Sequence, residues 1–207
     1  MGLRDYYVGA LKGAIYSQLP EATVVDISHD IPPFDIARAS FVIRNAYPHF
    51  PQGSVHIIGV NPELDLHEGV MHVLVGHKGH YFIGADNGIF SLLIDGEPEQ
   101  VFELSLSQAV DDLTFPTKDV FVPAACHLLR GGTPEIIGKV RGELKQRSMF
   151  RPVVEPNAIK GSIIYIDSYG NAITNITRNL FRESAKGRSF RVVYGGSNSI
   201  IREISDA

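Results

Sequence analysis

The sequence contains one cysteine in 207 residues, Cys126, and this scarcity excludes a fold held together by internal disulfides. A lone thiol fits a reducing compartment, and the N-terminus lacks the layout of a secretion signal, so we expect a cytoplasmic protein. Cys126 lies in the apolar run 120–129. This setting predicts a buried, unreactive thiol rather than a nucleophile.

Basic residues are too few to mark a surface for nucleic acid or anionic membrane. The chain has 19 Lys and Arg against 23 Asp and Glu, a formal net charge of −4. No apolar run approaches the length that spans a membrane. These absences predict a globular protein that binds neither nucleic acid nor membrane.

Several chemical signatures are also absent. The glycines are too scattered for a phosphate-binding loop, and no Gly-x-Ser-x-Gly nucleophile motif occurs. Five histidines crowd a short span, but their spacing matches no zinc pattern and no cysteine joins them. The sequence therefore predicts no metal and no cofactor. These histidines are expected to be half-exposed strand and turn residues: His56, His67, His72, His77 and His80.

Strand and helix patterns alternate over residues 1–132 and predict an α/β domain with a mostly parallel sheet. Residues 133–158 are loop-like and predict a linker, and residues 159–207 predict a small C-terminal β domain. Both ends of the chain look shortened, as if a first strand and the last strands were missing. Helices are expected at 5–18, 36–47, 89–93 and 120–130, and strands at 23–27, 54–60, 70–76, 80–84, 101–104, 161–166, 171–176, 189–194 and 199–204.

The stretch 164–176 is the most distinctive in the C-terminal domain. A β-branched and aromatic run ends on Asp167, and Tyr169, Gly170 and Asn171 follow before a second apolar run. This predicts a hairpin with more polar recognition groups than turn formation requires. Two interpretations stand side by side: a ligand-binding hairpin, or a plain tight turn rich in Asp and Asn.

Polar turns also follow the predicted strands of the N-terminal domain, at 26–35, 61–68 and 86–88. Ligands of open α/β sheets bind beyond the carboxyl ends of the strands, so these turns are candidate site loops. His29 lies in the first of them, next to Asp30 and two prolines. It is either a general base or a loop histidine that holds the turn by hydrogen bonds, and the second role is the commoner one.

Five stretches together resemble the S-adenosylmethionine hydroxide adenosyltransferase family, which is related to the fluorinating and chlorinating enzymes. Asp-Tyr-Tyr-Val-Gly-Ala-Leu-Lys-Gly at 5–13 is similar to the family's first helix. Val-Asp-Ile-Ser-His-Asp-Ile-Pro-Pro-Phe-Asp-Ile at 25–36 and Phe-Pro-Gln-Gly-Ser-Val-His at 50–56 follow in order. Ala-Asp-Asn-Gly at 85–88 and the hairpin from Asp167 to Ile176 complete the set.

The resemblance implies an α/β N-domain, a small β C-domain, and a homotrimer that binds S-adenosylmethionine between neighbouring subunits. The implied reaction is attack of water on the ribose C5′ of S-adenosylmethionine, which gives adenosine and methionine. A sulfonium is already an excellent leaving group, so the protein needs mainly to align the nucleophile and exclude competing solvent. S-adenosylmethionine is thus the expected substrate or ligand.

Matching positions assign the implied contacts residue by residue. Asp5 and Asp167 would bind the methionine ammonium, and Tyr7 would lie near the methionine end. Phe34 would pack on the ribose or adenine face, and Asn171 would contact the adenine edge. The remaining residues of the implied cleft are Asp86, Asn87 and Tyr169.

Two stretches depart from the family's pattern for activating water. Asn61 stands where the family has an aspartate, no arginine follows, and Pro116 stands where the family has a histidine. Three hypotheses follow: an enzyme with a substitute constellation, an impaired protein that binds S-adenosylmethionine or adenosine, and a structural trimer without ligand. The candidates for a substitute constellation are Asn61, Asp65, His67 and Lys118.

Overall fold

The computed structural model describes residues 2–105, 113–148 and 151–194. The chain divides into two compact units, Met1–Ser148 and Met149–Ala207. The α/β class expected from the sequence is confirmed. Among the described residues, no helix is long and apolar enough to cross a membrane.

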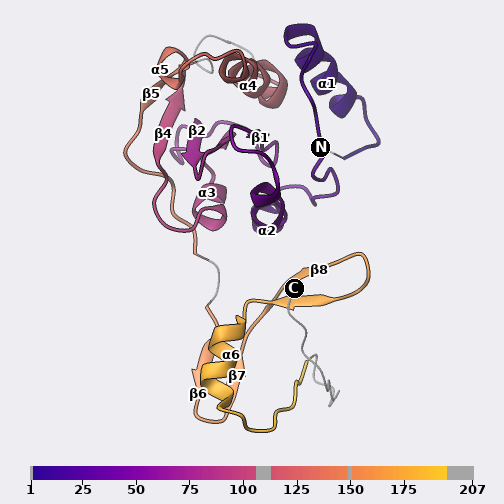
Figure 1. The fold of residues 1–207 in the computed structure, drawn as a ribbon, viewed down its shortest axis with the longest axis vertical. Coiled ribbons are helices and arrows are strands. Elements are labelled where there is room, and N and C mark those ends of the chain that lie inside the picture. The colour runs from indigo at the N-terminus through magenta and orange to yellow at the C-terminus, as the bar shows by residue number, and fades with distance from the viewer. Residues whose placement is uncertain (1, 106–112, 149–150, 195–207) are drawn as a thin grey trace. The chain divides into compact units, whose positions relative to one another are not determined.

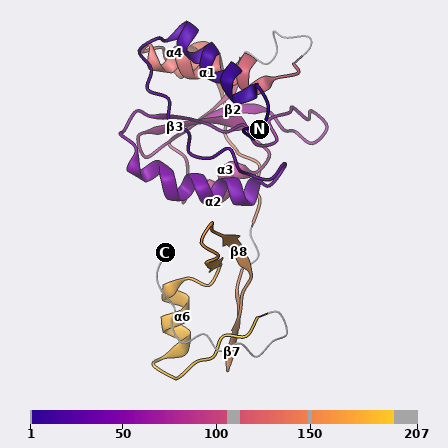
Figure 2. The same ribbon diagram turned by 90° about the vertical axis from the view of Figure 1, so that its right-hand side faces the viewer.

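The first unit is built on a five-stranded sheet with the strand order β1-β3-β2-β4-β5. Helices cover both faces of this sheet, with α1 and α4 on one side and α2 and α3 on the other (Figures 1 and 2). The strands are β1 (Val55–Ile57), β2 (His72–His77), β3 (His80–Ala85), β4 (Gln100–Leu104) and β5 (Gly138–Val140). The helices are α1 (Tyr7–Gln18), α2 (Ile36–Ala46), α3 (Ile89–Leu93) and α4 (Val122–Leu129).

The expectation of a mostly parallel sheet is wrong. Only β1 and β3 pair in parallel, whereas β2 pairs antiparallel with both β3 and β4, and β4 pairs antiparallel with β5. The cause is the two-residue turn between β2 and β3, where Lys78 and Gly79 have φ of +50° and +74°. Such a turn joins adjacent antiparallel strands.

The predicted strand at 23–27 is also absent, and these residues have no regular secondary structure. Val25 is 57% exposed, so the apolar run does not cross the interior. Continuous apolar character indicated a buried parallel strand, but among the described residues no strand pairs with this stretch to supply the hydrogen bonds. The stretch instead connects α1 to the loop at 28–35.

The helices agree better with the sequence. The Asp35 carboxylate accepts the backbone N–H of Arg38 at 2.8 Å, which confirms it as the cap of α2. A short 3₁₀ turn, η1 (Tyr47–His49), continues from that helix. The helix expected at 120–130 begins as a π-helical turn, η3 (Thr117–Phe121), that leads into α4. Cys126 is buried there, and burial raises the pKa of its thiol.

The stretch 133–158 was expected to be loop, and this is partly wrong. It contains α5 (Pro134–Ile137), β5, which extends the main sheet, and β6 (Val153–Glu155). Val140 and Gly138 pair with Phe102 and Leu104 of β4. Three-residue strands carry too little pattern to be distinguished from loop by sequence.

The second unit contains two hairpins and a helix. The elements are β6, β7 (Ala158–Lys160), β8 (Ile163–Ile166), β9 (Ala172–Thr174) and α6 (Arg178–Ala185). The β6–β7 and β8–β9 pairs are both antiparallel. The strand expected at 189–194 is irregular apart from an isolated bridge at its last residue, and the one expected at 199–204 lies outside the described residues.

Four of the five clustered histidines are buried rather than half-exposed: His56, His72, His77 and His80, each at most 6% accessible. His56 stacks on Phe82, and its Nε2 lies 3.4 Å from Nδ1 of His80. Burial, and then His80, lower the pKa of His56 to about 4. Within the described ranges no group of three His, Cys, Asp or Glu side chains could hold a metal ion.

Candidate functional site

The surface of the first unit is hollowed beyond the carboxyl end of β1. A cavity of about 410 Å³ adjoins a second of about 230 Å³, because both are lined by Gly59, Pro62 and Glu63. We call the two together the β1 hollow. Its larger part is also lined by residues 29–34, and its smaller part by Tyr7 and residues 114–117. The chain therefore places a concave site where an α/β sheet is expected to carry one.

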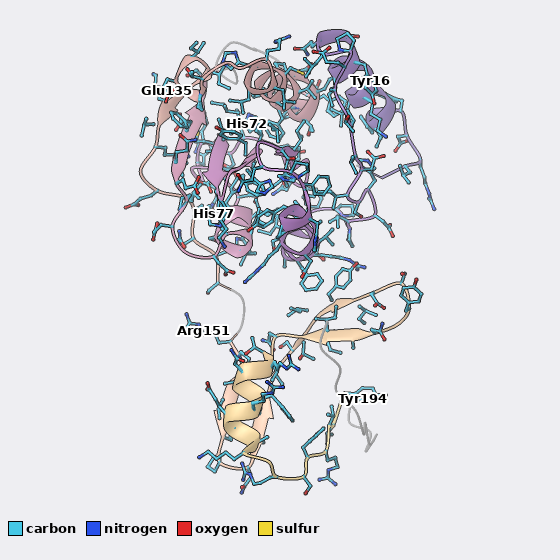
Figure 3. All side chains as sticks on the ribbon, in the orientation of Figure 1. Tyr16, His72, His77, Glu135, Arg151 and Tyr194 are labelled. Atoms are coloured by element: carbon cyan, nitrogen blue, oxygen red, sulfur yellow. The ribbon has the colours of Figure 1, made fainter. Side chains whose placement is uncertain are left out.

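The wall at 59–63 is held by one side chain from β2 and one from the turn that follows β3. Asn87 donates from Nδ2 to the carbonyl oxygens of Val60 and Asn61, at 3.2 and 3.0 Å. The His72 ring lies in the interior of the unit (Figure 3), and its Nε2 is 2.7 Å from the carbonyl oxygen of Pro62. Three consecutive carbonyls are thus held from below. This support explains how Asn61 keeps a left-handed backbone, with φ of +49°.

Phe34 forms part of the opposite rim of the larger cavity. Its ring is 70% exposed and its backbone has φ of +65°, which is unusual for a bulky residue. The two prolines before it and the capped helix after it hold the chain in this conformation. An exposed aromatic ring in a strained loop at the edge of a cavity is suited to stacking on a planar ligand.

Aromatic residues also form the smaller cavity. Tyr7 meets Phe115 edge to face, with ring centroids 5.2 Å apart. Pro116 and Thr117 line the same cavity at the start of the π-helical turn. Tyr7, Phe34 and Asn61 are therefore the sequence-predicted site residues that the structure brings to the β1 hollow.

The segment after α1 brings a charged group to the edge of the larger cavity. Asp26 Oδ2 lies 2.6 Å from Lys12 Nζ, and Asp26 Oδ1 lies 3.1 Å from His29 Nε2. The hydrogen bond from Lys12 lowers the pKa of Asp26, and His29 lowers it further. His29 is one of the residues that line the cavity.

Asp86 has a different place from the one expected. It is fully buried, accepts the backbone N–H of Lys145 at 3.0 Å, and pairs with Arg141 at 3.3 Å. Burial raises the pKa of its carboxyl group. Asp86 thus holds residues 141–145 and does not line the hollow. Asn87 does not line the hollow either, but it binds the backbone of Val60 and Asn61, which do.

The proposed substitute constellation does not assemble. Asp65 accepts the backbone N–H groups of His67 and Glu68, both at 3.0 Å, and so forms the turn it lies in. His67 is exposed. Lys118 pairs with its neighbour Asp119. Of the four candidates only Asn61 lines the hollow, because the other three side chains are used in local contacts or face solvent.

Three candidate residues lie in the second unit, on the turn between β8 and β9. Asp167 Oδ1 accepts the backbone N–H groups of Tyr169 and Asn171 at 2.9 and 2.8 Å, and Oδ2 accepts the Asn171 carboxamide at 2.7 Å. The Asn171 side chain is the main reason that the pKa of Asp167 is lowered. The Tyr169 ring is 91% exposed. Asp167 therefore shapes this turn, whatever else it binds.

Asp5 is exposed at the start of the first unit and is not among the residues that line the hollow. Sequence reasoning missed Glu63 and Phe115, which line it, and underrated His29. The signal for the last was the three-residue spacing between Asp26 and His29 after an apolar run. Glu63 and Phe115 carry no comparable signal, since each is an ordinary loop residue until the fold places it.

Comparison with known proteins gives this geometry a family. The model of the S-adenosylmethionine hydroxide adenosyltransferase N-terminal domain matches residues 1–138, and that of the C-terminal domain matches residues 161–206. The chain belongs to the S-adenosylmethionine hydroxide adenosyltransferase family. The resemblance read from the sequence motifs is thereby confirmed.

Individual relatives agree with the family assignment. An (R)-S-adenosyl-L-methionine hydrolase of Thermus thermophilus is 33% identical over 86% of this chain and 72% of its own. One of Methanocaldococcus jannaschii is 30% identical over 86% of this chain and 65% of its own. A fluorinase of Nocardia brasiliensis is more distant, at 24% identity over 86% of this chain and 69% of its own.

A solved structure of an uncharacterized conserved protein from Thermotoga maritima has the same fold. It superposes with a TM-score of 0.78 and 29% identity over 89% of this chain and 72% of that chain. The chain thus shares its architecture with a protein of similar sequence, and the β1 hollow lies within the matched N-terminal domain.

Proposed function

We propose that this adenosyltransferase-family protein hydrolyses S-adenosylmethionine at the ribose C5′, giving adenosine and methionine. The observation that carries the proposal is the β1 hollow, which joins the exposed Phe34 ring, the braced Asn61 backbone and the Tyr7–Phe115 pair. An aromatic ring and a firm polar wall suit a nucleoside, and Tyr7 at the second cavity suits the other end of the molecule.

The chemistry asks little covalent work of the protein. Water forms the O–C5′ bond as the C5′–S bond breaks, and sulfur leaves as a neutral thioether with the bonding electron pair. Rate therefore depends on in-line placement and on excluding other water. The relatives are named for the (R) epimer at sulfur, and we propose the same epimer here. Inverting the sulfur centre changes the direction of the C5′–S bond relative to the methionine chain. It therefore changes how that bond is aligned with the nucleophile when methionine is held in place.

The alternative is an impaired protein that binds S-adenosylmethionine or adenosine without turnover. A specific observation favours it: Asn61 and Pro116, which line the two cavities, offer neither a carboxylate nor an imidazole to a water molecule. A carboxamide can hold a water molecule by hydrogen bonds but cannot accept its proton at neutral pH. Binding and turnover must therefore be measured separately.

The decisive experiment incubates the full chain with the (R) and (S) epimers separately and follows adenosine by chromatography. Calorimetry on the same preparations measures binding. Adenosine from the (R) epimer supports the hydrolase, whereas binding without adenosine supports the alternative. Phe34→Ala is expected to weaken binding at least tenfold, and Tyr16→Ala, which removes a half-exposed ring on the outside of α1, is the matched control.

We further propose that the protein is a cytoplasmic homotrimer. The support is the family resemblance together with exposed apolar side chains on the first unit, among them Tyr6 at 73% and Leu66 at 73%. Light scattering on the purified chain tests the assembly, since a trimer gives three times the mass of one 22.7 kDa chain. A monomer at micromolar concentration would contradict it.

A further inference from the structure

We propose that His29, held by Asp26, is the general base that takes the proton from the attacking water. This inference rests on the proposed hydrolysis and names the group that would replace the missing activators. Nothing in the family resemblance or in the named relatives assigns this pair a role. It would make His29 the catalytic residue and Asp26 its positioning residue.

The location of His29 is the first argument. It is an imidazole side chain on the wall of the larger cavity, and Asn61 and Phe34 line the same cavity. Its side chain is 19% accessible, so it is sheltered without being sealed off. A general base must lie within reach of the proton that it abstracts, and the cavity wall satisfies that first requirement.

The pairing of the ring is the second argument. His29 Nε2 is buried and lies 3.1 Å from Asp26 Oδ1, in a close contact that is not aligned as a hydrogen bond. In ligand-free enzymes such contacts are often poorly aligned and tighten when substrate binds. A carboxylate on one ring nitrogen keeps the proton there and leaves the other nitrogen as the acceptor. Within the described residues, no hydrogen bond occupies Nδ1 of His29.

The state of Asp26 is the third argument. Its other oxygen, Oδ2, is bound by Lys12 Nζ at 2.6 Å, which anchors the carboxylate to α1. An anchored carboxylate can orient the imidazole and stabilise the imidazolium that forms as the proton arrives. Lys12 thus supports the pair through a contact that does not involve the histidine itself.

The proton transfer balances without a further reagent. Water attacks C5′, the O–C5′ bond forms, and the C5′–S pair leaves with methionine sulfur. The proton of the water passes to His29 Nδ1 and then to solvent, so the histidine is regenerated. Two other acids, Asp30 and Glu63, line the cavity as well. Among the residues that the structure describes, no hydrogen bond or ion pair orients either carboxylate toward a water, and each is therefore tested in parallel as a rival base.

The experiment uses the full chain and measures adenosine formation and calorimetric binding of S-adenosylmethionine. His29→Gln retains a polar side chain that can contact Asp26, and His29→Ala opens space for added imidazole. Both variants are expected to lose about 100-fold or more in kcat while the dissociation constant stays within about threefold. Imidazole in the buffer should restore part of the rate of His29→Ala. Asp26→Asn should lose about tenfold, since the base remains but is poorly oriented.

The controls make each result decisive. His49→Ala removes an exposed histidine on η1, outside the hollow, and should leave both readouts unchanged. Full activity in either His29 variant overturns the inference, as does a loss of binding and rate together without rescue by imidazole. A larger loss in Glu63→Gln or Asp30→Asn than in His29→Gln overturns it in favour of that acid. If the unmodified chain binds but forms no adenosine, the proposed hydrolysis itself fails, and the base role with it.

Discussion

Two aspartates of this chain head similar polar turns, yet the fold gives them opposite electrostatic environments. Asp86 is buried at the end of β3, where desolvation raises the pKa of its carboxyl group and Arg141 partly offsets that cost. Asp167 is in the exposed turn after β8, where the Asn171 side chain and backbone lower the pKa of its carboxyl group. The comparison teaches that similar turn sequences headed by aspartate can place the carboxylate in the interior, where it holds a distant segment, or at the surface, where it forms its own turn. Burial, and not residue type, decides which.

The largest effect is expected from breaking the buried side of this comparison. Asp86→Ala removes the buried acceptor of the Lys145 N–H and the closer of the two carboxylates that pair with the Arg141 guanidinium. We expect a loss of about 3–5 kcal/mol in the free energy of unfolding, measured by urea titration. Asp95→Ala breaks an ion pair with Arg44 at a side chain 65% exposed and should cost less than about 1 kcal/mol. Equal losses in the two variants would contradict the burial argument.

The second largest effect is expected when acid protonates the buried His56. The folded-state pKa of His56 is about 4, below the ordinary histidine value of 6.5, so the unfolded chain takes up a proton first as the pH falls. The contribution of neutral His56 to the free energy of unfolding is therefore fully present above about pH 6.5. It is lost as the pH drops toward 4, and the loss is roughly 3 kcal/mol. His56→Phe keeps a ring against Phe82 and should flatten this dependence between pH 7.5 and 4.5. An unchanged slope of urea midpoint against pH would refute the assignment.

A smaller effect is expected at the brace of the hollow. Asn87→Ala removes the donor to the carbonyls of Val60 and Asn61. It should cost about 1–3 kcal/mol of stability and also weaken ligand binding, because the wall loses its fixed backbone. Asn45→Ala, which removes one exposed carboxamide contact to Phe41, should cost under about 0.5 kcal/mol. Urea denaturation and calorimetry are measured on both variants. If Asn87 holds the wall of the hollow, Asn87→Ala loses stability and ligand binding together, whereas a residue that only packs in the core would lose stability alone.

The smallest change in stability is expected from the exposed side. Asp167→Ala removes a side chain whose hydrogen bonds, among the described residues, lie within its own exposed turn, so the melting temperature should barely move. If Asp167 also binds the methionine ammonium, the dissociation constant for S-adenosylmethionine should rise about tenfold. Glu155→Ala, at an acid of the same unit paired with Lys160, is the matched control. Unchanged binding in Asp167→Ala would leave the carboxylate with its turn-forming role alone.

Much of the first unit could be predicted from the sequence because its signals are local. The cap at Asp35, the helix Ile89–Leu93 and the turn at Lys78–Gly79 depend on a few neighbouring residues. The predictions of a mostly parallel sheet and of a strand at 23–27 were wrong, because pairing partners are set by contacts between segments far apart in sequence. For the same reason the sequence predicted Asn61 in a site loop but not the Asn87 and His72 contacts that fix it.

The sequence by itself determined the family, the class of the fold and the aromatic and polar residues available to a site. Only the tertiary structure decided which of them meet. It buried Asp86, left Asp167 at the surface, and brought the segment after α1 to the β1 hollow with His29 against Asp26. The physical reason is that a side chain's charge and reactivity depend on its solvation and its partners, and both are properties of the folded chain.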